Sequence, residues 1–301
     1  MSKDPLAVTT LIVPVAGYGT RSLPFTKALP KVMLPLVDKP GIQHIVEQAV
    51  AGGIEQVILI TSANQHPIED HFDYYYELEE RLRQSGKLEL LEEIRRVSDL
   101  AHFVYLRQKE QLGNAHAVWQ AESIVGDQPF IVQWGDDVIL PQPGQSESFV
   151  AGLKSLYTEL NGDADAIIAV IETDDIGASK YAIVETEDDN GHERVTSIIE
   201  KPGPDATTSR LASVTGFLLT PQIFSYISNL DPEQGAGGEY VMADAIKAMI
   251  ADGKKVYAKR ISGRRYDIGN KLEYMKAAVE IGLEHPEIGD DFHEYLKSLT
   301  L

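Results

Sequence analysis

The sequence predicts an α/β protein built on a mixed, mainly parallel sheet that is flanked by helices. Two apolar runs, Leu11–Val15 and Gln56–Thr61, have the length and composition of buried strands, and a helical pattern over Gly41–Gly52 lies between them. Strand, loop, helix and strand in this order is how a parallel α/β sheet begins. A β-rich stretch and two helices follow nearer the C-terminus. The predicted fold is therefore Rossmann-like, with a smaller β-rich part and C-terminal helices.

The other elements are expected from the same apolar spacing and from turn residues. Further strands are predicted at His102–Gln108, Pro129–Trp134, Ala164–Val170, Tyr181–Glu185, Arg194–Glu200, Leu211–Thr220 and 255–260. Further helices are predicted at 66–97 (a charged amphipathic pair), Gly113–Ser123, 148–160, 221–229, 238–252 and, twice, from Asn270 to the end. The Asp-Asp-Asn-Gly run at 188–191 predicts a β-hairpin.

Composition limits the function classes. The chain has 301 residues and a formal net charge of −19, which argues against nucleic acid and anionic membranes as partners. It contains no Cys, so it has no disulfide framework and no thiolate nucleophile. This fits a cytoplasmic protein, and neither a signal peptide nor an apolar run of about 20 residues is seen. We expect one domain over 1–301, with an approximate first half at 8–175, a second at 176–268 and helices at 269–301.

The loop from Pro14 to Pro40 is the most informative stretch. It follows an apolar strand and carries the run G-Y-G-T-R at 17–21, and then Lys27 and Lys31. Glycine lets the backbone turn sharply and approach a ligand, and successive backbone N–H groups in such a turn form an anion site. In so acidic a chain these cations stand out, and we interpret the loop as a binding site for nucleotide phosphates.

Two familiar phosphate-binding motifs do not match this loop. The P-loop spacing G-x-x-x-x-G-K-[ST] is absent. The dinucleotide fingerprint G-x-G-x-x-G opens a helix, but here its third glycine position is Ser22. Pro24, Pro30 and Pro35 also exclude a long helix, because proline lacks the N–H group and clashes with the preceding turn. We therefore expect a long ordered loop.

The pattern G-x-G-T-R-x-x-P-x-T-K-x-x-P-K-x-M-L-P-L-V-D-K-P at 17–40 resembles the sugar-1-phosphate nucleotidylyltransferases. Within them it is most similar to the bacterial UTP–glucose-1-phosphate uridylyltransferases, over nearly the whole chain. The resemblance implies Mg²⁺-dependent transfer of UMP from UTP to glucose 1-phosphate, giving UDP-glucose and pyrophosphate. It also implies a homodimer or homotetramer.

Carboxylates at strand ends are the candidates for holding the metal ion. Asp136 follows a predicted strand and a glycine, the place where open α/β sheets carry their chemistry, although a solvated turn explains it equally well. The resemblance makes Asp136 a metal ligand, with Asp137 as the neighbouring alternative, and adds Asp267 from the run Y-D-I-G-N-K-L. It gives Arg21 and Lys31 the catalytic role of holding the triphosphate and stabilising charge on the α-phosphate.

The resemblance also assigns contacts to the two substrates. Backbone and amide contacts to the nucleotide would come from Ala16, Gly17, Gly19, Thr20, Gln108 and Gly113. Contacts to the sugar phosphate would come from Lys201, Glu200, Tyr181, Ala182 and Gly216. A glutamine amide suits the edge of uracil, a lysine suits a phosphate and a glutamate accepts hydrogen bonds from sugar hydroxyls.

Five departures from the family pattern matter for the function. They are Val32, Ala182, Phe217, Val241 and Ala243, where the family has Glu, Gly, Arg, Gln and Thr. Most of these positions belong to the sugar half, so other sugar 1-phosphates stay open as substrates. A local V-T-G run at 214–216 resembles the thymidylyltransferases and keeps dTTP open. An alternative of another class is a non-catalytic paralogue that binds nucleotide sugars.

Overall fold

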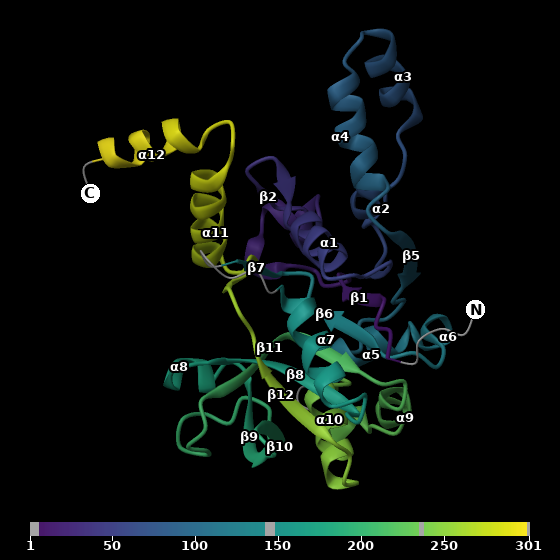
Figure 1. Ribbon diagram of the computed structural model, residues 1–301, viewed down its shortest axis with the longest axis vertical. Coiled ribbons are helices and arrows are strands. Elements are labelled where there is room, and N and C mark those ends of the chain that lie inside the picture. The colour runs from purple at the N-terminus through teal and green to yellow at the C-terminus, as the bar shows by residue number, and fades with distance from the viewer. Residues whose placement is uncertain (1–5, 142–147, 235–237, 300–301) are drawn as a thin grey trace.

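The computed structural model describes residues 6–141, 148–234 and 238–299. Within these ranges nine strands form one mixed sheet (Figure 1). In spatial order the strands are β5 (His102–Arg107), β4 (Gln56–Thr61), β1 (Thr10–Pro14), β6 (Phe130–Gln133), β11 (Leu211–Leu219), β8 (Ala166–Glu172), β12 (Val256–Arg260), β10 (His192–Ile199) and β9 (Ala182–Asp189). Strands β10 and β11 run opposite to the others. The predicted mixed, mainly parallel α/β sheet is confirmed.

Side chains that alternate along the strands divide the core between the two faces of the sheet. Ile12 and Ile58 pack with α5, α9 and α10, whereas Leu11 and Leu59 pack with α1, α2 and α7. The helices are α1 (Gly41–Ala51), α2 (His66–Phe72), α3 (Tyr76–Gln84), α4 (Leu88–Ser98), α5 (Asn114–Trp119), α6 (Glu122–Val125), α7 (Phe149–Glu159), α8 (Asp175–Ala178), α9 (Ile223–Ser228), α10 (Met242–Ala251), α11 (Lys271–Glu284) and α12 (Gly289–Ser298). Because β1 and β4 are buried on both faces of the sheet, their sequences are continuous apolar runs.

Three predicted helices differ from the structure. The charged segment 66–97 forms α2, α3 and α4 instead of a pair, because Asp73 is extended and ends α2. The segment Gly113–Ser123 is divided between α5 and α6. The helix predicted at 238–252 begins only at Met242, because the backbone of Tyr240 donates a hydrogen bond to Leu112 and accepts one from Ala115 in α5. The predicted hairpin is confirmed by β9 and β10, joined through Asn190 and Gly191 at positive φ.

The loop from Pro14 to Pro40 is ordered and contains no long helix, as predicted. Three short 3₁₀ turns, η1 (Thr20–Ser22), η2 (Phe25–Lys27) and η3 (Lys31–Met33), lead to a small pair of strands, β2 (Pro35–Leu36) and β3 (Lys39–Pro40). The loop from Pro14 to Pro40 thus connects the carboxyl end of β1 to the start of α1.

Elsewhere in the chain another short turn, η4, occupies Pro232–Gln234.

A second small sheet was not predicted. Strand β7 (Asp137–Leu140) pairs antiparallel with β13 (Arg264–Asp267), and the register sets Asp267 opposite Asp137. Helix α11 packs over this pair, and α12 then projects away from the sheet, as do α3 and α4 at the other side (Figure 1). No helix in the described ranges has the length and apolar character to cross a membrane. The division into halves stays a prediction, since one sheet runs through both.

Candidate active site

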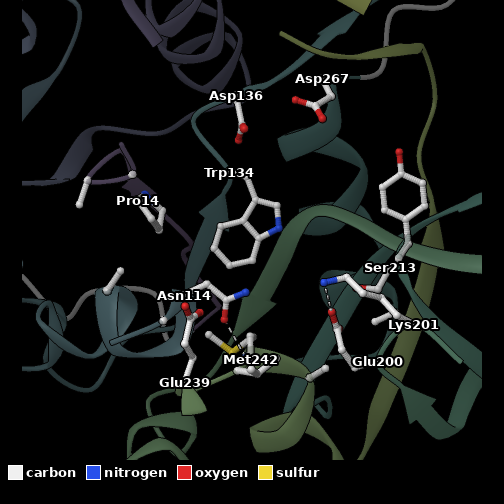
Figure 2. A pocket seen from close by; sticks show the side chains of 18 of the residues that line it. Pro14, Asn114, Trp134, Asp136, Glu200, Lys201, Ser213, Glu239, Met242 and Asp267 are labelled. Carbon is white, nitrogen blue, oxygen red and sulfur yellow. Dashed lines mark hydrogen bonds and ion pairs between the residues drawn. The ribbon is translucent and has the colours of Figure 1, made fainter. Parts of the chain in front are cut away.

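A cavity of about 570 Å³ lies at the carboxyl ends of the parallel strands. Its walls come from the loop after β1, the segment after β5, the end of β6 and the strands β9 to β11. Figure 2 shows Asp136 and Asp267 at one end of the cavity, Glu200 and Lys201 at the other side and Trp134 between them. This is the edge at which open α/β sheets bind their ligands.

The glycine loop delivers two cations to one end of the cavity. Gly19 adopts φ 62°, and a Cβ at this position would lie 2.9 Å from Thr26 Cγ2, so this turn requires glycine. Thr26 Oγ1 donates a hydrogen bond to Gly19 O at 2.8 Å and so closes the turn. Arg21 and Lys31 line the cavity, whereas Lys27 is exposed and does not line it. Of the three cations on which the phosphate site was predicted, the structure therefore brings together two.

Two carboxylates meet these cations. Lys31 Nζ donates to Asp136 Oδ2 at 2.5 Å, and Arg21 donates to both oxygens of Asp267 at 2.9 and 3.2 Å. Arg21 Nη2 also lies 3.6 Å from Asp136. Although burial opposes the shift, the charges of Lys31 and Arg21 lower the pKa of Asp136, so this carboxylate is ionised. Residues far apart in sequence thus form one charged cluster.

The same two carboxylates converge on one point beside Gly269. A Cβ built on Gly269 would lie 3.0 Å from Asp267 Oδ1 and 3.2 Å from Asp136 Oδ2. Within the described ranges no three His, Cys, Asp or Glu side chains form a metal site alone. Two carboxylates together with phosphate oxygens and water are nevertheless the donor set of hard divalent cations. The residues fit a cation that is shared with a bound triphosphate.

Asp137 does not join this cluster. Its carboxylate accepts two hydrogen bonds from Arg265, at 2.7 and 2.9 Å. Burial raises the pKa of Asp137 to about 6, although the charge of Arg265 opposes the shift. Asp137 is therefore held by Arg265 and does not line the cavity, and the choice of Asp136 instead of Asp137 as the metal ligand stays a prediction.

The opposite side of the cavity holds the predicted sugar-phosphate residues. Lys201 and Glu200 line it and form an ion pair at 3.2 Å, drawn as a dashed line in Figure 2. Tyr181 and Ala182 line it as well. Gly216 does not line the cavity. It lies where β11 pairs with β6, and a Cβ at this position would be 1.8 Å from Val132 O. This glycine is explained by strand packing instead of a ligand contact.

The residues predicted to contact the nucleobase lie on a third wall of the cavity. Gln108 is buried and donates from Nε2 to Gly113 O at 3.1 Å. Gly113 has φ 113°, and a Cβ there would lie 2.4 Å from Tyr240 O. Ala16 and Gly17 also line the cavity, whereas Gly19 and Thr20 do not. Glycine at 113 is therefore required by both its backbone conformation and its close neighbour.

Sequence reasoning missed several lining residues. Asn114 lines the cavity, and its Oδ1 accepts a hydrogen bond from Met242 N at 2.8 Å, which ties the start of α5 to α10. Trp134, Ser213 and Glu239 also line it. Trp134 ends a predicted strand directly before Gly-Asp, and this position could have identified it. Nothing local in the sequence marks the others.

Four of the five departures from the family pattern fall on this cavity. Ala182, Phe217, Val241 and Ala243 line it, and each is less than one tenth exposed. They give the sugar half a partly apolar wall. Val32 is fully buried in the core beneath the glycine loop and does not line the cavity.

This fold, with paired cations and paired carboxylates at the ends of parallel strands, defines a nucleotidyl transferase. The sequence profile of the nucleotidyl transferase family matches residues 11–283, and the chain belongs to this family.

Comparison with individual proteins narrows the similarity. The chain is 40% identical over 293 residues to the UTP–glucose-1-phosphate uridylyltransferase of Bacillus subtilis, covering 97% of each chain. Its structure is similar to a UTP-bound UGPase from Acinetobacter baumannii, with a TM-score of 0.87 and 35% identity over 98% of this chain and 100% of that one. A UDP-glucose pyrophosphorylase complexed with UDP-glucose matches with a TM-score of 0.79 and 33% identity, over 90% of this chain and 97% of the other.

Proposed function

We propose that this protein transfers UMP from UTP to glucose 1-phosphate, with Mg²⁺ as cofactor, and releases UDP-glucose and pyrophosphate. The observation that carries the proposal is the cavity itself. Two cations and two converging carboxylates occupy one end, and the Lys201–Glu200 pair occupies the opposite side. Two anionic substrates can therefore be held facing each other. The proteins named above, to which this chain is similar, are a UTP–glucose-1-phosphate uridylyltransferase, a UGPase and a UDP-glucose pyrophosphorylase.

The reaction joins a phosphate oxygen of the sugar phosphate to the α-phosphorus of UTP. The bond from that phosphorus to the bridging oxygen of the β-phosphate breaks, and pyrophosphate leaves. Arg21 and Lys31 stabilise the negative charge that grows on the α-phosphate, while Lys201 holds the attacking phosphate. Bound Mg²⁺ would neutralise charge on the triphosphate, held by Asp136 and Asp267.

Binding of the nucleotide and the metal ion should break the ion pairs that the free site contains. Arg21 and Lys31 now neutralise Asp267 and Asp136, so a metal–nucleotide complex must replace both pairs. The triphosphate would take the two cations, and the two carboxylates would hold the metal ion. Each partner thus supplies charges that replace an ion pair broken by the other, which favours binding of the nucleotide and the metal together.

A second candidate is transfer to another sugar 1-phosphate. The apolar wall of Ala182, Phe217, Val241 and Ala243 favours it, because these side chains offer no hydrogen bonds to sugar hydroxyls. Gln108 and Gly113 are the proposed base contacts, and thymine offers them the same hydrogen-bonding edge as uracil, so dTTP stays open as the nucleotide. A homodimer or homotetramer stays a prediction.

The test is Mg²⁺-dependent pyrophosphate release with purified protein and a matched pair of variants. Asp136→Asn should lose at least about 100-fold in rate, because it removes a metal ligand of the transfer step. Asp99→Asn changes an exposed carboxylate directly after α4, outside the cavity, and should keep the wild-type rate. An Asp136→Asn protein with an unchanged rate and metal response would remove Asp136 from the site.

A further inference from the structure

A buried ion pair lies behind the cavity, between its carboxylate end and its sugar half. Arg265 donates from Nη2 to Asp137 Oδ1 and from Nε to Asp137 Oδ2, and their side chains are only 13% and 3% exposed. Among the described residues that line the cavity, neither Arg265 nor Asp137 is found. Such a pair fixes geometry through its two parallel hydrogen bonds but adds little net stability, which indicates a positioning role.

Arg265 reaches the sugar half through Tyr181. Its Nη1 donates to the hydroxyl of Tyr181 at 3.2 Å, and its guanidinium carbon lies 5.2 Å from the centre of that ring. The backbone carbonyl of Tyr181 in turn accepts a hydrogen bond from Lys201 N at 3.2 Å. Lys201 has φ 44°, a conformation that a lysine adopts only where its surroundings hold it. The position of Lys201 thus depends on Tyr181.

Asp137 reaches the same half through β11. Its Oδ2 accepts a hydrogen bond from Thr215 N at 2.9 Å. Thr215 has φ 64° and lies in an irregularity of β11, where the register with β8 shifts between Ser213 and Phe217. Both of these residues line the cavity. The ion pair therefore holds two walls of the sugar half by separate contacts.

We infer that Arg265 is a positioning residue for the sugar 1-phosphate: it fixes Tyr181, and through it Lys201, against the carboxylate end of the site. This inference rests on the proposed function. Gln108 and Gly113, on the base side, are joined by their own hydrogen bond. Loss of Arg265 should therefore weaken binding of the sugar phosphate much more than binding of UTP.

The experiment compares Arg265→Met and Tyr181→Phe with the matched control Arg264→Met. Arg264 is the neighbour of Arg265 on β13 and also forms ion pairs, but with Glu280 and Glu284 of α11, away from the cavity. KM values for glucose 1-phosphate and for UTP are measured, together with the affinity for UDP-glucose in EDTA, where no metal contributes. The melting temperature of each variant reports on folding.

Arg265→Met should raise the KM for glucose 1-phosphate about 10-fold or more and weaken UDP-glucose binding similarly, as expected for a lost charged hydrogen bond. The KM for UTP should change less than about threefold, and Arg264→Met should resemble wild type. Tyr181→Phe leaves the ion pair in place and should show a smaller effect in the same direction. It decides the matter if Arg265→Met does not fold.

Unchanged sugar-phosphate KM and UDP-glucose affinity in a folded Arg265→Met protein would overturn the inference, as would equal losses for both substrates. So would wild-type behaviour of Tyr181→Phe if Arg265→Met does not fold. Failure of the wild-type protein with glucose 1-phosphate would instead contradict the proposed function. The Arg265 comparison would then be made with the sugar 1-phosphate that the wild type uses or with UDP-sugar binding in EDTA.

Discussion

Replacing Arg21 by alanine should affect metal binding and turnover in opposite directions. In the structure Arg21 neutralises the carboxylates that we assign to the metal, at 2.9 Å from Asp267 and 3.6 Å from Asp136. Without nucleotide, this cation competes with a metal ion for the same oxygens. During turnover, however, the same side chain should stabilise the α-phosphate.

The size of the first effect follows from the geometry. Two unit charges about 4 Å apart interact by about 1 kcal/mol in water, and exposed ion pairs contribute about 0.2–1 kcal/mol. The Arg21 side chain is 59% exposed, so the value for solvent applies. About 1 kcal/mol corresponds to about a fivefold gain in metal affinity for Arg21→Ala. Loss of charge stabilisation at the α-phosphate should lower kcat about 100- to 1,000-fold.

Titration with Mn²⁺ without nucleotide, followed by electron paramagnetic resonance, measures the affinity, and pyrophosphate release measures kcat. Arg260→Ala is the matched control, because Arg260 is 48% exposed and pairs with two carboxylates, Glu172 and Glu193, and none of the three residues lines the cavity. It should leave both quantities unchanged. Unchanged or weaker Mn²⁺ binding in Arg21→Ala would refute the idea that Arg21 and the metal share the carboxylates.

Three further predictions concern glycines and two partly buried histidines. Gly269→Ala places a methyl group within 3.2 Å of both metal carboxylates, so kcat should fall about 100-fold with an unchanged melting temperature; a wild-type kcat would contradict the convergence. Gly113→Ala, at φ 113° and 2.4 Å from a backbone oxygen, should lose about 1–3 kcal/mol in denaturant unfolding and raise the KM for UTP, and neither change would occur if this turn tolerated a side chain. Burial lowers the pKa of His44 and His71 in the folded protein, so their contribution to the free energy of unfolding is complete above the unfolded pKa of about 6.5 and is lost as pH falls below it. The denaturation midpoint should therefore be lower at about pH 5.5 than at about pH 7.5, and replacing both histidines by glutamine should reduce this difference. An equal difference in both proteins would speak against it.

Local chemistry explains what could be predicted. The apolar run at Gln56–Thr61 is buried on both faces, so the strand β4 has the predicted bounds. Proline and glycine constrain their own backbone, and for this reason the Pro14–Pro40 loop and the Asn190-Gly191 turn were predicted correctly. These features depend on residues that are neighbours in sequence.

Long-range pairing explains what could not be predicted from the residues alone. Asp136 and Asp267 meet because β7 pairs with β13, and each of these strands has four residues, too few to show an alternating pattern. Arg265 carries no local signal, since its role depends on Asp137 and Tyr181 across the fold. The resemblance supplied Asp267, but it gave no reason to choose Arg265.

In the proposed function the two halves of the cavity hold UTP and glucose 1-phosphate for transfer. The most direct measurement is pyrophosphate release with Mg²⁺, crossing UTP and dTTP with glucose 1-phosphate and other sugar 1-phosphates. We expect turnover with UTP and glucose 1-phosphate, and we expect EDTA to stop it. No release with any pair, together with measurable binding of UDP-glucose, would contradict it and identify a non-catalytic nucleotide-sugar-binding protein.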